Sequence, residues 1–233
     1  MKVLTNEKII KRNARIGQYT SLIALLILAG GMVISFTMQQ QIYLSFAALM
    51  VGFILSQIGI YYGNRWGRSP RADERLTTAL KGLTKDYTLY HYLTPVSHLL
   101  VGPAGVWILS PHYQRGTITF EKNRWKQTGG GLMLSYLKIF AQEGLGRPDL
   151  EIQAEMDELT ASLKKNLGDD LPPLHASLVF TDDRAQLQAE NAPHPTLKLE
   201  QLKDYLRKTA KENPLPAEQL KRISAALPQE SVF

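Results

Sequence analysis

Three polar residues, Ser97, Ser110 and His112, stand at the ends of two short apolar runs, where their types and spacing could support chemistry. A serine hydroxyl acts as a nucleophile when a base lies within hydrogen-bond distance of it. Ser110 and His112 are two positions apart, so on an extended strand their side chains share one face. Pro111 lies between them, however, and the chain has no Gly-x-Ser-x-Gly elbow to present a serine nucleophile. We therefore expect polar residues that fill a non-catalytic site.

The composition excludes several other kinds of site. The chain has 233 residues and no cysteine, which rules out disulfides, thiolate nucleophiles and cysteine-bound zinc. None of its five histidines forms the i, i+4 pair of a helical zinc site. The segment Gln127–Gly131 is predicted to be a flexible loop, and its glycine run lacks the Lys-Ser/Thr that completes a phosphate-binding loop.

A mixed α/β domain must position these polar residues. Apolar runs at 96–101 and 106–109 predict two buried strands, and Gly102-Pro103-Ala104-Gly105 between them has the composition of a turn. The remaining segments predict, in chain order, a helix at 71–83, a strand at 88–93, a hairpin at 116–126 turning at Glu121-Lys122, a short apolar segment at 132–141, a helix at 150–167, strands at 174–180 and 196–198, and helices at 199–211 and 217–227. This order predicts an α/β (α+β) fold with a mixed sheet.

Two uncharged apolar spans, 19–38 and 42–62, precede this domain. Each is long enough to cross a hydrocarbon core of ~30 Å at ~1.5 Å per residue. Two adjacent spans favour a transmembrane helical hairpin over buried core helices, and they also argue against a cleaved signal peptide. We therefore divide the chain into a basic N-terminal segment (1–18), the helical hairpin (19–62), a linker (63–70) and a domain (71–233).

The net charge of +6 lies at the two flanks of the predicted helical hairpin. Residues 1–64 hold five basic groups and one acid, 65–75 hold four arginines and two acids, and 76–233 hold eighteen of each sign. Because Lys and Arg stay on the cytoplasmic side, we expect a protein of the inner (plasma) membrane with two spans and both termini cytoplasmic. Residues 1–15 themselves fit either a surface helix or a disordered tail.

The second span carries small residues spaced three or four positions apart, which places them on one face of a helix. Such a face permits close approach of another helix. Its partner is either the first span, in a tight intramolecular pair, or a second copy of the chain in a homo-oligomer. The small residues are Ser45, Ala48, Gly52, Ser56 and Gly59.

The segment 97–118, SHLLVGPAGVWILSPHYQRGTI, resembles the nuclease-related domain (NERD) family of the PD-(D/E)xK nuclease-like superfamily. The family pattern is Asp-His, an apolar strand, Gly-Pro-Ser/Ala-Gly, a second apolar strand, Glu-x-Lys and a Gly-Xaa-Ile strand. Glu74 stands where the family has a glutamate on its first helix, and the late segments 174–190 and 196–206 also resemble the family. The resemblance implies a restriction-endonuclease-like domain. In the family, two carboxylates bind a divalent metal, and a lysine helps to position or activate water.

This chain departs from that pattern at the residues that matter for cleavage. Ser97, Ser110 and His112 occupy the positions of the aspartate, the glutamate and the lysine, and only Glu74 and His98 stand as in the family. Neutral hydroxyls do not replace carboxylates as ligands of Mg²⁺. We therefore expect no metal site and no cofactor, and we assign a catalytic role to none of these residues. We also expect His98 to point away from Ser97, its neighbour on the strand.

The expected function is that of a membrane-anchored, catalytically inactive nuclease-related protein, in contact with the lipid bilayer, whose cytoplasmic domain binds a protein or nucleic acid. One alternative is an active Mg²⁺-dependent nuclease with a rearranged site that uses Glu74 with Asp86, Glu121 or His112. Another is a membrane scaffold or adaptor without a nucleic-acid role, with the last helices as its partner surface.

A basic group close to the former site is a weak candidate for nucleic-acid binding, and its other interpretation is a solvated hairpin. The zero net charge of 76–233 argues against strong phosphate binding, which relies on Lys and Arg to release counterions. The group consists of Arg115, Lys122, Arg124 and Lys126.

Overall fold

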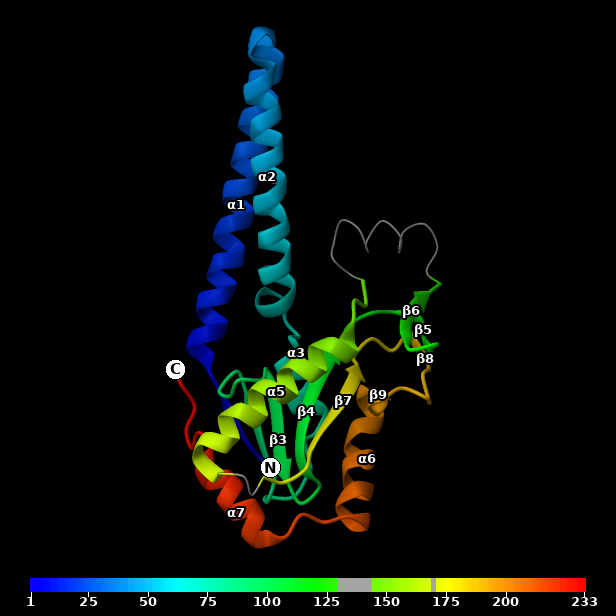
Figure 1. Ribbon diagram of the computed structural model, residues 1–233. Coiled ribbons are helices and arrows are strands. Elements are labelled where there is room, and N and C mark those ends of the chain that lie inside the picture. Colours follow the sequence, from blue (N-terminus) through cyan, green and yellow to red (C-terminus); the bar gives the residue numbers. More distant parts are fainter. Residues whose placement is uncertain (130–143, 169–170) are drawn as a thin grey trace.

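Two long antiparallel helices, α1 (Glu7–Thr37) and α2 (Ile42–Tyr62), project from one end of an α/β domain in the computed structural model (Figure 1). The structure describes residues 1–129, 144–168 and 171–233. A short 3-10 turn, η1 (Gln39–Gln41), joins the two helices at the end farthest from the domain. Both helices are long and apolar enough to cross a membrane. Their large apolar side chains are mostly exposed, which does not fit core helices of a domain.

Small residues at intervals of seven line the contact between α1 and α2. On α1 they are Gly17, Ala24 and Gly31, and on α2 they are Ser45, Gly52 and Gly59; all six are buried. The Ser45 hydroxyl donates a hydrogen bond to the Gly31 carbonyl at 2.7 Å. The predicted small-residue face of the second span therefore packs within the chain against α1, as the intramolecular alternative expects.

Six strands form the main sheet, in the spatial order β1 (Lys2–Thr5), β2 (Thr88–His91), β3 (His98–Gly102), β4 (Gly105–His112), β7 (Leu174–Phe180) and β9 (Thr196–Lys198). The strands β2, β3 and β4 are antiparallel, whereas β1, β7 and β9 run parallel to their neighbours. The predicted turn holds: Gly102 pairs with Gly105, and the left-handed φ of Gly105, 106°, suits glycine.

The main sheet is covered on both faces. One face packs against α3 and α6 around Leu76, Trp107 and Leu202, and the other packs against α5 and α7 around Ile108, Ile152 and Ile223. A central strand buried on both faces needs a continuous apolar run, which explains Val106–Leu109. The covering helices are α3 (Ala72–Ala79), α5 (Pro148–Leu167), α6 (Leu199–Glu212) and α7 (Ala217–Ala226).

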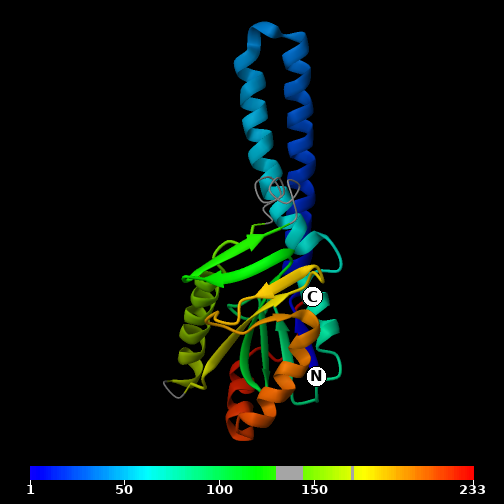
Figure 2. The ribbon, with the colours of Figure 1, turned by 90° about the vertical axis from the view of Figure 1, so that its right-hand side faces the viewer.

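A second, smaller sheet lies across the end of the domain nearest the helical pair (Figure 2). Its order is β6 (Arg124–Thr128), β5 (Gly116–Glu121) and β8 (Ala185–Gln188). The predicted hairpin exists, but its turn is Lys122-Asn123, because these two residues adopt the left-handed φ values of 49° and 59°. The strand β8 was not expected, because its alternation of apolar and polar residues is short.

The N-terminus differs most from expectation. Residues 2–5 form neither a surface helix nor a disordered tail but strand β1, which pairs in parallel with β2 and buries Leu4. Four residues with one buried side chain are too short for a periodic signal. The next residue, Asn6, caps α1 by accepting a hydrogen bond from the Ile9 N–H at 3.1 Å.

Smaller differences concern the linker and the helix that follows it. Residues 63–67 continue α2 as a π-helical turn, η2 (Gly63–Gly67), so the predicted linker begins as helix. The predicted helix at 71–83 spans only Ala72–Ala79, with Arg71 at its N-cap and Leu80 at its C-cap. The apolar segment predicted at 132–141 lies outside the described residues.

Substitutions at the adjacent glycines Gly30 and Gly31 test the packing of α1 against α2. A Cβ added at Gly31 would lie 2.8 Å from the Cβ of Ala48, whereas one added at Gly30 would have nothing within 4 Å. Gly31→Leu should therefore force α1 and α2 apart and lower the free energy of unfolding by about 1–3 kcal/mol. Gly30→Leu, the matched control, should be neutral or slightly stabilising, because leucine favours helix. Thermal unfolding of the full chain in detergent measures both variants, and equal effects would contradict this packing.

Candidate functional site

The candidate site lies at the edge of the main sheet that is formed by strand ends, where the central strands β3 and β4 begin and end, respectively. Leu99 pairs with Ile108, and the same register continued places Ser97 opposite Ser110. His112 ends β4 and pairs with Phe180 at the end of β7. The structure thus brings Ser97, Ser110 and His112 to one sheet edge.

Ser110 and His112 lie side by side on β4. The strand continues through Pro111, so the two side chains share a face as expected, with the Ser110 Oγ and the His112 Nε2 3.2 Å apart. The His112 ring stacks on Phe180 and is buried, and this burial lowers its pKa to about 4. Within the described ranges, no carboxylate is hydrogen-bonded to the ring. The imidazole is therefore a neutral, weak base, which is poorly suited to activate a serine.

The Ser97 side chain is held by Arg65, which the sequence identified only as a basic residue after the second apolar span. The Arg65 Nη2, from η2, donates a hydrogen bond to the Ser97 Oγ at 2.7 Å. The Arg65 guanidinium also lies 5.1 Å from the ring centroid of Trp66. A cation thus stands beside the Ser97 hydroxyl. No local sequence signal marks this contact, because the two residues are 32 positions apart.

Two glutamates of α5 complete the surroundings of Arg65. Burial raises the pKa of Glu155 to about 7, although the Arg65 charge and a hydrogen bond from the Ser97 N–H favour its ionised form. Burial also raises the pKa of Glu151, again against the Arg65 charge. Sequence reasoning missed both residues, because acidic residues on a helix of mixed charge resemble a solvated face.

His98 is turned to the opposite side of β3, as expected. Its Nδ1 lies 2.9 Å from the Nδ1 of His91, whose Nε2 lies 2.9 Å from the Thr77 hydroxyl. Burial lowers the pKa of both histidines, to about 4 for His91 and well below the ordinary value for His98. The pair is therefore neutral, and it connects α3, β2 and β3.

Glu74 does not join the three residues at the sheet edge. Its carboxylate accepts hydrogen bonds from the Ser69 hydroxyl at 2.6 Å and from the Arg71 N–H at 2.9 Å, and it pairs with the Arg71 guanidinium at 3.0 Å. The Ser69 hydrogen bond lowers the pKa of Glu74 despite the opposing effect of desolvation. The carboxylate is thus committed to the start of its own helix.

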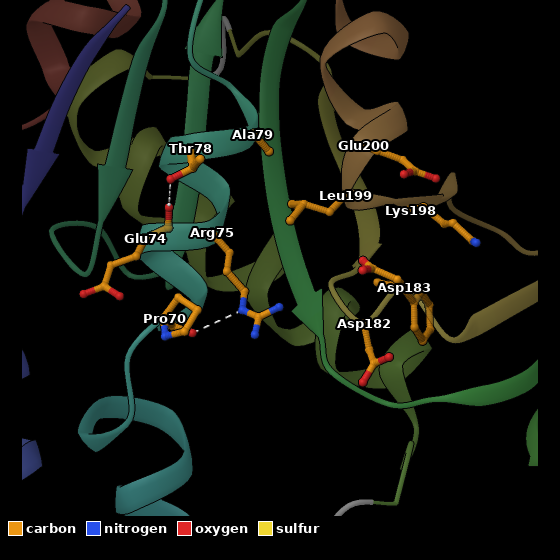
Figure 3. Close-up of a pocket in the computed structure, with 11 residues that line it drawn as sticks. Pro70, Glu74, Arg75, Thr78, Ala79, Asp182, Asp183, Lys198, Leu199 and Glu200 are labelled. Atoms are coloured by element: carbon orange, nitrogen blue, oxygen red, sulfur yellow. Dashed lines mark hydrogen bonds between the residues drawn. The ribbon is translucent and has the colours of Figure 1, made fainter. Parts of the chain in front are cut away.

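A groove of about 550 Å³ lies on the other side of Glu74, between the start of α3, the end of β7 and the start of α6 (Figure 3). In Figure 3 the Glu74 carboxylate points away from Asp182, whereas Arg75 extends toward it. Arg75 donates hydrogen bonds to the Pro70 and Thr181 carbonyls. An ion pair and hydrogen bonds with Arg184 lower the pKa of Asp182 to about 2. The groove also includes Lys198, so its lining mixes both charges.

The other acids named for a rearranged metal site stay apart. Asp86 precedes β2, whose first residue Thr88 pairs with Val101, so it lies at the sheet edge opposite Ser97. Glu121 ends β5 in the small sheet and pairs with Lys126 at 3.6 Å. In the part of the chain that the structure describes, no three histidine or acidic residues are grouped closely enough to hold a metal ion.

The four basic residues near the site belong to the β5–β6 hairpin and its start. Arg124 and Lys126 are exposed on either side of the buried Trp125, which places them on the outer face of β6. Lys122 is exposed in the turn, and the Arg115 carbonyl accepts a hydrogen bond from Gln127. This arrangement is compatible with both a solvated hairpin and a weak anion-binding face.

Comparisons of the chain with protein-family models, with curated proteins and with solved structures give no match.

Glu155 provides a pH test of the site. Because its folded-state pKa is about 7 and its ordinary value is 4.5, the folded chain keeps a proton that the unfolded chain has released. This contribution to stability is complete below about pH 4.5 and is lost as the pH rises to about 7. Glu155→Gln stays neutral and still accepts from the Ser97 N–H, so it should raise the free energy of unfolding by about 1–3 kcal/mol at pH 8 and hardly at pH 4.5.

Chemical unfolding of the full chain in detergent at the two pH values measures this difference. Glu158→Gln, an exposed change on the same helix, is the control and should show little dependence on pH. A Glu155→Gln effect of the same size at both pH values would contradict a buried, protonated Glu155.

Proposed function

We propose that this chain is a membrane-anchored, nuclease-related protein that lacks cleavage chemistry and serves as a binding module on the cytoplasmic side of the membrane. One observation carries the proposal: the Arg65 guanidinium is bonded to Ser97, at the position where the family has a metal-binding aspartate. A positive charge beside neutral hydroxyls repels a divalent cation, which needs anionic oxygen ligands.

The order of elements supports the nuclease-related part of this proposal. A helix, an antiparallel run of three strands, a second long helix and a parallel strand occur in this chain order as α3, β2, β3, β4, α5 and β7, with the hairpin β5–β6 inserted between β4 and α5. The matching segment 97–118 forms the centre of this arrangement, and its Gly-Pro-Ala-Gly turn connects β3 to β4. This chain order is compatible with the resemblance of the segment 97–118.

The membrane anchoring rests on the helical pair and on the charges at its base. The domain and both termini lie at the same end of the pair (Figure 1). The flanks that carry the excess of Lys and Arg are also at this end, which favours a cytoplasmic domain.

Binding without catalysis fits the polar features better than a rearranged nuclease site does. The carboxylates named for a rearranged nuclease site do not meet there: Glu74 is bonded at the start of its own helix, Glu121 pairs with Lys126 and Asp86 lies at the far ends of the strands. The last helices bury their inward faces in the core at Leu202, Leu206 and Ile223, which leaves their outer faces for a partner. The groove beside α3 has a volume in the usual range for ligand sites and is the place where we expect the module's ligand to bind.

A metal-restoration experiment tests the proposal on the full chain in detergent. The unchanged protein should not bind Mn²⁺ at millimolar concentration and should not cleave DNA in the presence of Mg²⁺ or Mn²⁺. Arg65→Ala combined with Ser97→Asp and Ser110→Glu removes the cation and restores two carboxylates at one sheet edge, so it should bind Mn²⁺. Isothermal titration calorimetry measures the binding, and circular dichroism checks that the variant folds.

The control changes the same charges at exposed positions elsewhere: Arg68→Ala with Gln188→Glu and Gln219→Glu, which should not bind Mn²⁺. DNA cleavage by the unchanged protein that disappears with Glu74→Ala would overturn the proposal. This second arm remains decisive even if the restored variant fails to fold.

A further inference from the structure

Four cations form a stripe along the first turns of α1, at its base. At 3.6 residues per turn they fall within an arc of about 100° on the helix. The residues buried on this part of the helix, Ile10, Asn13 and Gly17, lie on the opposite side. The basic stripe consists of Lys8, Lys11, Arg12 and Arg15, and all four residues are exposed.

Among the described residues, the four cations are not neutralised by ion pairs, although Glu7 stands four positions before Lys11 on the same helix. Throughout the described residues, none of its four members forms an ion pair with a carboxylate, and the one hydrogen bond from their side chains runs from the Arg12 Nε to the Asn13 Oδ1 at 3.3 Å. Like charges three or four positions apart on a helix repel each other. Membrane topology requires cations near the span but does not require them on one face. The arrangement therefore calls for an anion outside the chain.

The height of the stripe matches the lipid headgroups. The apolar span begins at Tyr19, and α1 continues without a break from Glu7. At ~1.5 Å per residue, Arg15 and Arg12 lie about 6 and 10 Å below Tyr19, and Lys8 lies about 16 Å below it. A headgroup layer is about 5–8 Å thick on each side of the bilayer. Arg15 and Arg12 thus reach the phosphates, while Lys8 and Lys11 lie nearer the aqueous side.

The first turn of α1 is attached to the main sheet, so the basic stripe stays at the same distance from the start of the apolar span. Strand β1 is hydrogen-bonded to β2, and Asn6, which caps α1, also bridges to Val232 near the C-terminus. A site held by the sheet does not need to be ordered when the ligand binds, which favours affinity.

We propose that the basic stripe binds the phosphate groups of anionic phospholipids in the leaflet on the domain's side. This inference rests on the proposed membrane anchoring. Each cation close to the surface strengthens the association with an anionic lipid about fivefold, and salt weakens it. Binding of several headgroups by one face of α1 would also hold the domain in one orientation beneath the bilayer.

Electron spin resonance with spin-labelled lipids tests the proposal on the full chain in phosphatidylcholine vesicles. The protein-contacting fraction of labelled phosphatidylglycerol should exceed that of labelled phosphatidylcholine severalfold at low ionic strength. The preference should vanish at about 1 M salt, where the Debye length falls to about 3 Å. Arg12→Gln with Arg15→Gln should reduce the preference about fivefold or more, whereas Arg12→Lys with Arg15→Lys should retain it.

The matched control is Lys211→Gln with Lys221→Gln, which removes two exposed charges from the last helices and should leave the preference unchanged. Lipid contact without a preference for phosphatidylglycerol, or a preference that survives Arg12→Gln with Arg15→Gln, would overturn the inference alone. Absence of any lipid contact would instead contradict the membrane anchoring. Duplex DNA binding that is lost with Arg12→Gln and Arg15→Gln, with lipid preference intact, would assign the stripe to nucleic acid and also overturn the inference.

Discussion

The pairing of β1 with β2 ties the long helices to the domain. Leu4 is buried by this pairing, and Asn6 caps α1 immediately after the strand, so no flexible segment separates sheet from helix. On the other side of the helical pair, η2 carries Arg65 back to the sheet edge at Ser97. The helical pair is thereby attached to the domain at two places, which limits how far the domain can tilt beneath a membrane.

The second attachment also determines the character of the candidate site. A guanidinium that bonds to Ser97 and faces Glu151 and Glu155 makes this edge a structural junction between anchor and domain. The same positions carry metal ligands in the family that the segment 97–118 resembles.

Burial gives the junction opposing responses to pH. His91, His98 and His112 are buried and neutral, so acidification through their ordinary range favours the unfolded chain, where they are free to bind protons. Glu155 acts in the other direction, because its half-buried carboxyl is most stable when protonated. Both effects have the same cause, which is the cost of a charge beneath the end of the sheet that faces the helical pair.

The sequence by itself determined the parts of the molecule whose signals are local: the two apolar helices, the strands around Gly102–Gly105, the long helix ending at Leu167 and the strand Leu174–Phe180. The sequence also predicted that Ser110 and His112 share one face of their strand, because alternate residues of a strand point to the same side. Only the tertiary structure decided the rest. Strand β1, strand β8 and the Arg65–Ser97 contact join segments far apart in the chain, and the pKa of Glu155 depends on burial by such segments. Periodicity and composition describe neighbours along the chain, so they carry no information about these partners.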